Sequence, residues 1–160
     1  MAKVFNEAIT SIGKCEIDYL NNTIVVLLLT NAPDIDADTF ISDLSGEVTG
    51  GGYARKTLAS KTITTDDAND RAIFDAADIQ WTALTATFRY IVVAQSTGNN
   101  STSRCITTID TGENQNIDAG TYDIAWPVSG VFFIQNPANK LWPFSNQHNQ
   151  QHLTTLAQWL

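Results

Sequence analysis

A regular alternation of side chains between residues 84 and 95 constrains the fold more than any other feature of the sequence. One face of this segment is apolar and aromatic, with Leu84, Ala86, Phe88, Tyr90, Val92 and Ala94. The other face starts polar and turns apolar toward its end, with Thr85, Thr87, Arg89, Ile91, Val93 and Gln95. Successive side chains of a β-strand point to opposite faces, so the pattern predicts one long strand whose first face covers the core.

Other segments predict further, shorter strands. Residues 23–30, TIVVLLLT, form a continuous apolar run, whose length and β-branched start favour a strand covered on both faces over a buried helix. Alternation of apolar and polar residues predicts strands over 15–19 and 121–126. Further short strands are predicted over 61–65, 71–75, 104–110 and 131–134. The region between 110 and 121 carries Gly and Asn and is typical of a turn.

Two short segments have helical character. A group of apolar residues recurs at helical spacing before Gly13, where the helix would end: Phe5, Ala8, Ile9 and Ile12. Asp36 or Asp38 is a suitable N-cap for a second short helix that would run through Leu44. We therefore expect helix to be a minor component of the domain.

The composition agrees with a mainly β fold. Only 16% of the residues are charged, and most of the polar ones are Thr, Ser, Asn and Gln, which favour pleated surfaces and turns. About seven short strands separated by turns predict a β-sandwich or a small barrel. Long polar loops favour the sandwich, jelly-roll-like or of mixed connectivity. A chain of 160 residues is by default one domain, which we place at 1–135, followed by a C-terminal arm at 136–160.

The arm combines polar tracts with large apolar side chains, and Pro137 and Pro143 interrupt any strand in it. Its predicted interface residues are Leu141, Trp142, Phe144, Trp159 and Leu160. A segment of this kind cannot form its own core, so it either folds back on its domain or packs against another chain. We expect the second, because aromatic anchors are typical of interface hot spots.

The charge balance bears on partners and on location. Seventeen acidic residues outnumber nine basic ones, and the net charge is −8, so binding to nucleic acid or to anionic lipid is not expected. The longest apolar run, residues 24–29, is too short for a transmembrane helix, and the N-terminus shows no signal-peptide pattern. We therefore expect synthesis in the cytoplasm, with Cys15 and Cys105 as buried thiols, although the sequence leaves a disulfide between them open.

Catalytic and metal-binding patterns are incomplete. His148 and His152 would share one face of a helix, but no acidic or cysteine ligand stands near them in the sequence. Both lie in the arm, so the domain body has no histidine to serve as the base of a nucleophile–His arrangement. Paired carboxylates of the kind that hydrolyse glycosides cannot be judged from spacing, so a hydrolase remains the third and least favoured function.

Two further motifs have simpler interpretations. Asp34, Asp36 and Asp38 resemble the start of a calcium loop, but Thr39 and Ser45 occupy the positions where that loop needs Gly and Glu. The triple glycine at 50–52 lacks the Lys of a phosphate loop and predicts a tight turn or a close backbone approach. We expect no metal, no cofactor and no catalytic residues.

Three blocks of the sequence together resemble a known class of proteins. They are GEVTGGGYARKTLASKTI at 46–63, AIFDAADIQWTALTATFRYIVVAQ at 72–95 and ITTIDTGENQNIDAGTYDIAWPVSGVFFIQ at 106–135. Their order and spacing are similar to those of small structural proteins of tailed bacteriophages, of the head decoration or cement type. Arg55 and Lys56 stand near the place where those blocks have Gly-Gly.

The resemblance implies a non-enzymatic virion protein on the capsid surface, whose partner is the major capsid protein and whose role is to bridge and stabilise capsid subunits. Because an icosahedral shell is symmetric, the resemblance also implies a homo-oligomer, either a dimer or a trimer. Within this reading Trp81 and Trp126 are core residues, whereas Tyr53 and Arg89 are either structural or interface anchors. An alternative is a head-fibre or tail-associated module that binds carbohydrate or a receptor. In that case Trp142 and Trp159 would be the sugar platforms.

Overall fold

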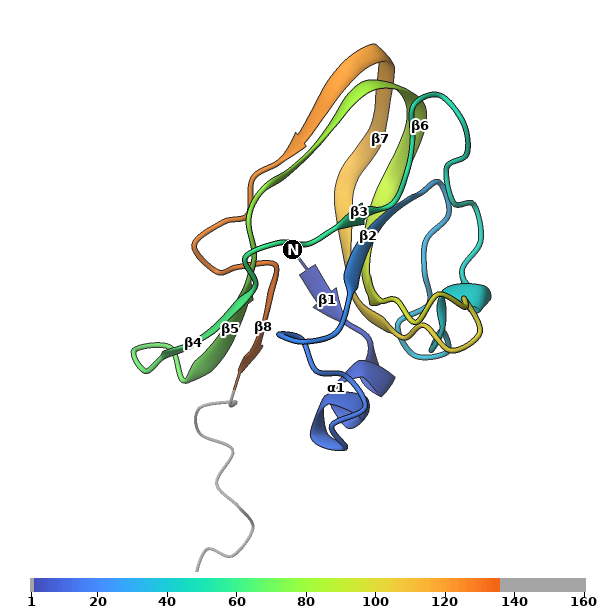
Figure 1. The fold of residues 1–160 in the computed structure, drawn as a ribbon. Coiled ribbons are helices and arrows are strands. Elements are labelled where there is room, and N and C mark those ends of the chain that lie inside the picture. Colours follow the sequence, from blue (N-terminus) through green and yellow to red (C-terminus); the bar gives the residue numbers. More distant parts are fainter. Residues whose placement is uncertain (1, 136–160) are drawn as a thin grey trace, which may run out of the picture.

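The computed structural model describes residues 2–135, which form two antiparallel β-sheets and one α-helix around a shared core (Figure 1). This arrangement confirms the predicted mainly β, sandwich-like fold. The elements in chain order are β1 (Ala2–Val4), α1 (Asn6–Gly13), β2 (Ile24–Leu29), the 3-10 turn η1 (Ile41–Asp43), β3 (Lys56–Thr57), β4 (Thr62–Asp66), β5 (Arg71–Asp75), β6 (Ile79–Gln95), β7 (Cys105–Ile124) and β8 (Phe132–Gln135).

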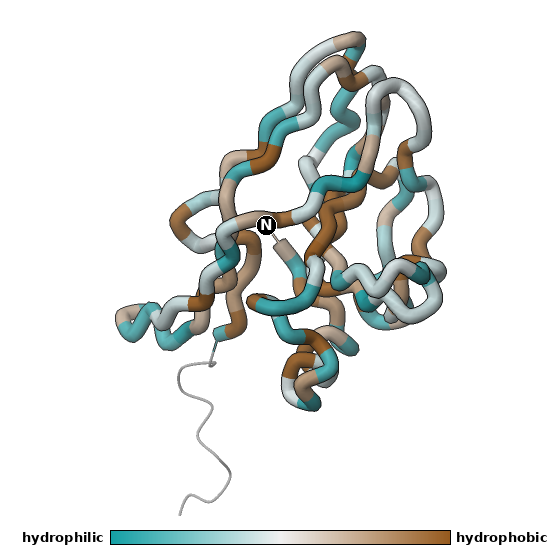
Figure 2. The backbone as a smooth tube through the Cα atoms, viewed as in Figure 1, coloured by the Kyte–Doolittle hydropathy of each residue, from teal (hydrophilic) through white to brown (hydrophobic). Residues whose placement is uncertain are grey.

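The larger sheet has the strand order β1-β7-β6-β2-β3, and the smaller one has the order β4-β5-β8. Every neighbouring pair within the two sheets is antiparallel. Strand β2 lies between β6 and β3, and all six of its residues are buried, as predicted for a strand covered on both faces. Figure 2 shows apolar residues gathered along β2.

Strands β6 and β7 form one long hairpin that arches over the molecule (Figure 1). The half nearest the connecting loop 96–104 pairs with β2 and β1, whereas the other half of each strand pairs only with its hairpin partner. The ladder shifts register between Trp81 and Leu84 and again before Ala86, and Ala83 and Ala119 adopt positive φ. Bulges of this kind bend strands, and they account for the arch.

An aromatic cluster of Tyr19, Phe74 and Phe132 joins the smaller sheet to the loop after α1. The Phe74 and Phe132 rings stack with centroids 4.4 Å apart, and Tyr19 meets Phe74 edge-on at 5.4 Å. Burial raises the pKa of Tyr19, whose hydroxyl donates a hydrogen bond to the carbonyl oxygen of Asp75. Because Tyr19 comes from the loop after α1, this cluster also fixes the N-terminal segment against the smaller sheet.

The predicted strand at 15–19 is wrong. The segment is a turn, although Ile17 and Tyr19 are buried and Glu16 and Asp18 are exposed, as the alternation indicated. The carboxylate of Asp18 accepts hydrogen bonds from the backbone amides of Leu20 and Asn21. These local bonds hold the backbone in a turn instead of a ladder.

Two other predictions need correction. The expected turn between 110 and 121 is continuous strand, since β7 runs from Cys105 to Ile124. The expected helix through Leu44 is only the 3-10 turn η1. Its start is held by Asp43, which accepts hydrogen bonds from the amides of Thr39 and Phe40, and not by Asp36 or Asp38.

Candidate functional site

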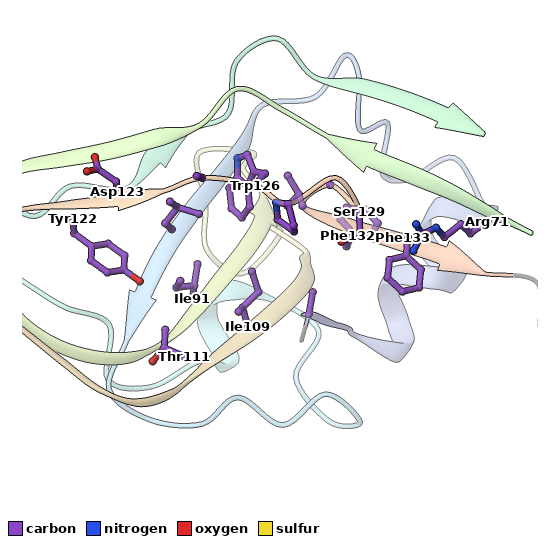
Figure 3. A pocket seen from close by; sticks show the side chains of 16 residues that line it. Arg71, Ile91, Ile109, Thr111, Tyr122, Asp123, Trp126, Ser129, Phe132 and Phe133 are labelled. Carbon is purple, nitrogen blue, oxygen red and sulfur yellow. The ribbon is translucent and has the colours of Figure 1, made fainter. Parts of the chain in front are cut away.

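A groove of about 580 Å³ opens between the arch of β6 and β7 and the segment 125–133 (Figure 3). Its volume lies within the range of roughly 300–1,000 Å³ typical of ligand pockets. It is lined by Ala2, Arg71, Ile91, Ile109, Thr111, Tyr122, Asp123, Ile124, Ala125, Trp126, Pro127, Ser129, Gly130, Val131, Phe132 and Phe133.

The surface of the groove is mainly apolar. Ile91 and Ile109 come from the paired strands β6 and β7, where they face each other in the ladder, and Phe132 comes from β8. Tyr122 and Trp126 add aromatic rings, and Figure 3 shows Ile91, Ile109 and Thr111 side by side on the two strands. The groove therefore suits apolar or aromatic groups.

The polar side chains of the groove are largely engaged with the domain itself. Arg71 pairs with Asp66 at 2.8 Å and lies over the Phe133 ring at 4.9 Å. The Thr111 hydroxyl donates to the carbonyl oxygen of Arg89 at 2.9 Å, and Asp123 accepts from the Gln80 amide at 2.6 Å. These contacts leave few polar atoms to recognise a polar ligand.

Trp126 is held rigidly at the edge of the groove. Its indole Nε1 donates to the carbonyl oxygen of Ala77 at 3.1 Å, and its backbone amide donates to the carboxylate of Asp78 at 2.9 Å. It is only half-buried, whereas Trp81 is 1% exposed. The prediction of two core tryptophans is therefore confirmed for Trp81, while Trp126 packs against the core and also lines the groove.

The loop that contains the triple glycine at 50–52 packs against the bulge of β6. The amide of Thr85 donates to the carbonyl oxygen of Gly51 at 2.6 Å, and a Cβ at Gly51 or Gly52 would overlap the carbonyl oxygen of Thr85 or Ala83. All three glycines have positive φ. The predicted turn with close backbone approach is thus confirmed, and its function is to dock the loop on β6.

A hydrogen-bond network fixes the two ends of the same loop. Arg55 makes a bidentate ion pair with Glu47 through bonds of 2.7 Å and 2.6 Å, and the hydroxyl of Tyr53 donates to Glu47 at 2.8 Å. Burial would raise the pKa of Glu47, but the hydrogen bonds from Arg55 and Tyr53 outweigh it and lower that pKa. Trp81 joins the network from β6, since its Nε1 donates to the carbonyl oxygen of Ala54 at 2.7 Å. Tyr53 is therefore a structural residue.

The acidic cluster at 34–38 is used for local structure. Asp34 accepts hydrogen bonds from the amides of Asp36 and Ala37, and Asp38 accepts one from the amide of Asp34. Asp36 accepts a hydrogen bond from the side chain of Asn6, which begins α1. Within residues 2–135 no group of three or more His, Cys, Asp or Glu side chains is arranged to hold a metal ion.

The two cysteines differ from expectation. Both are free thiols, and only Cys105 is buried, so the prediction of two buried thiols is wrong for Cys15. Cys15 follows the end of α1 with φ +59°, in a turn that leaves it exposed. Burial raises the pKa of Cys105 to about 12, and the negative charges of Asp38 and Asp43 add to that effect.

The predicted interface residues Leu141, Trp142, Phe144, Trp159 and Leu160 lie outside the described residues, as do His148 and His152. Among the helices that the structure describes, none has the length and apolar character needed to cross a membrane. No family model matches the chain, and neither a curated protein nor a solved structure shows significant similarity to it.

Proposed function

We propose that this chain is a non-enzymatic structural protein of a tailed-bacteriophage virion, which decorates the capsid and stabilises it. It binds the outer shell through the major capsid protein and bridges neighbouring subunits, acting as a dimer or trimer. Its location is then the capsid surface, after synthesis in the host cytoplasm.

The observation that carries this proposal is the arrangement of the three sequence blocks with phage-like character. The first block supplies the glycine loop, which docks on the bulge of β6 in the second block through the bond between Thr85 and Gly51. The third block supplies β7, which pairs with β6 along the whole arch. Trp81 of the second block is tied to Ala54 of the first.

The distinctive residues of these blocks therefore serve the scaffold. Gly51 and Gly52 allow close backbone contact, Trp81 fills the core, and Glu47 holds Arg55 and Tyr53. A set of motifs whose members build a rigid domain is what a binding protein needs, because its function is to present surfaces in fixed positions.

The proposal is tested by locating the chain in virions. Mass spectrometry of purified particles should detect it at a fixed ratio to the major capsid protein, and electron microscopy should place it on the outer shell. Purified chain added to empty capsids that lack it should bind saturably and raise the temperature at which the shells break. Absence from purified virions would contradict the proposal.

A second candidate, a carbohydrate- or receptor-binding module, has one observation in its favour. Tyr122 and Trp126 present rings along a groove that also contains Asp123, and aromatic surfaces with a few polar groups are typical of small-molecule sites. A glycan array separates the two functions. Binding of a defined glycan that Trp126→Ala abolishes would favour the second, provided that the variant remains folded.

A further inference from the structure

We propose that the groove between the arch and β8 is the docking site for residues 141–144 of the same chain, Leu-Trp-Pro-Phe. This assigns the first apolar cluster of the arm to its own domain and leaves Trp159 and Leu160 for a neighbouring molecule. The proposal rests on the groove and on the sequence that follows β8, and it does not depend on the proposed function.

The groove has the surface that such a segment requires. It exposes Ile109, Trp126 and Phe133 in a hollow of about 580 Å³, far larger than a packing defect. Several of its polar side chains, among them Arg71 and Thr111, are already bonded within the domain. An occupant gains mainly by burying apolar surface, which stabilises at about 25 cal/mol per Å².

The chain leaves the domain beside this groove. Residue Gln135, the last of β8, pairs in the ladder with Arg71, and both Arg71 and Phe133 line the groove. Five residues, 136–140, separate Gln135 from Leu141. Six backbone steps span at most about 20 Å, which is enough to turn back into a hollow whose rim lies two residues away.

The start of the arm is opposite in charge to the surface beside the end of β8. The last acidic residue of the chain is Asp123, and Lys140, next to Leu141, is the only Lys or Arg after residue 135. The exposed carboxylates Asp67 and Asp70 belong to the turn between β4 and β5, where Gln135 donates a hydrogen bond to Asn69. The positive charge of Lys140 therefore complements the acidic turn beside the end of β8.

Tethering favours the chain's own segment over one from a second copy. A short flexible linker holds its end near the site at an effective concentration in the millimolar range. A second copy reaches the same local concentration only at high protein concentration. Dilution therefore distinguishes the two occupants.

The four tryptophans provide the test. The full-length chain is labelled with 5-fluorotryptophan, and the fluorine NMR signals of Trp81, Trp126, Trp142 and Trp159 are assigned by replacing each in turn with Phe. We expect the Trp142 signal to lie away from its position in the denatured chain, and Trp142→Phe to shift the signal of the groove residue Trp126. The Trp81 signal reports whether the core is intact, because this side chain is 1% exposed.

Two matched substitutions in one loop probe the groove. Ala125 and Val128 are both exposed in the loop between β7 and β8, and Val128 is 96% exposed. Ala125 lines the groove, whereas Val128 does not. Ala125→Arg should return the Trp142 signal to its denatured position while the Trp81 signal stays unchanged. Val128→Arg should leave both signals in place.

The outcomes decide the proposal as follows. A displaced Trp142 signal that is independent of protein concentration and is lost in Ala125→Arg supports it. A Trp142 signal at the denatured position in the unmodified chain overturns it, as does a displaced signal that Ala125→Arg does not move. Loss of the displacement on serial dilution overturns it too, because the occupant is then a second copy.

Discussion

The amide of Thr85 donates a hydrogen bond to the carbonyl oxygen of Gly51, and a side chain at Gly51 would overlap the carbonyl oxygen of Thr85. This contact joins the loop after β2 to the bulge that bends β6. It makes the curvature of the arch depend on a glycine that is distant in the sequence.

Gly51→Ala should lower the free energy of unfolding by about 2–5 kcal/mol. About 1–2 kcal/mol comes from placing alanine at φ +56°, and about 1–3 kcal/mol from the forced shift of the β6 backbone. The matched control is Gly50→Ala, where φ is also positive but nothing lies within 4 Å of the added Cβ, so only about 1–2 kcal/mol is lost. Urea denaturation measures both, and equal losses would show that the contact with Thr85 is unimportant.

Arg55→Met should lower the free energy of unfolding by about 1–2 kcal/mol, because it removes a bidentate bond to Glu47. The pair is partly exposed, 28% and 27% at the two side chains, so solvent screening keeps the effect below that of a buried pair. In a Glu47→Gln background, Arg55→Met should lower the free energy of unfolding only slightly. Additive losses in this double-mutant cycle would mean that the two residues act independently.

The two thiols should react at very different rates. Cys15 is exposed, whereas Cys105 is 1% exposed and its pKa is raised to about 12 by burial. Ellman's reagent at neutral pH should therefore modify one thiol quickly in the native protein and the second only after denaturation. Cys15→Ser should remove the fast phase completely, and two fast thiols in the native protein would contradict the structure.

The melting temperature should fall as the pH drops from about 4 toward 2, with Asp110 contributing. The hydrogen bonds from Arg89 and from the amide of Gly112 lower the pKa of Asp110 from 3.8 to about 2. The folded state therefore binds a proton at Asp110 less readily than the unfolded state does. The stabilisation of the folded state by ionised Asp110 is present above the ordinary pKa of 3.8 and is lost as the pH falls toward about 2.

Asp110→Asn should flatten part of that pH dependence. Asp118→Asn is the matched control, since Asp118 is exposed on the same strand and forms no ion pair within the described residues. Melting curves recorded by circular dichroism at several pH values measure both. The same flattening in the two variants would show that the bond from Arg89 has no special role.

The sequence predicted the strands whose side-chain pattern is local. The apolar run at 23–30 corresponds to β2, and Leu84, Phe88 and Val92 lie in the core as the alternation required. The start of β6 was predicted too late, because the positive φ at Ala83 breaks the alternation between Trp81 and Leu84.

The distal part of β7 was missed because little of it faces the core; between residues 111 and 120 only Ile117 is a large apolar residue packed against it. It forms a two-stranded ribbon whose surface is largely exposed, so polar residues occupy both faces and read as a turn. The groove was missed for a different reason. Its walls come from β5, β6, β7 and β8, and no single segment carries its pattern. The only local signal was Trp126, an aromatic residue at the end of the predicted strand 121–126.

The burial of β2 has a consequence for synthesis of the chain. Ile24–Leu29, sequence IVVLLL, pairs with residues 90–95, so its partner is translated about 66 residues later. At roughly 5–20 residues per second, the ribosome takes about 3–13 s to supply it. During that interval this hexapeptide lacks its partner strand. Because it is uncharged and has high β-propensity, it has the composition that drives aggregation. Yield in the cell should therefore depend on how quickly the ribosome reaches β6 and on chaperones that bind nascent chains.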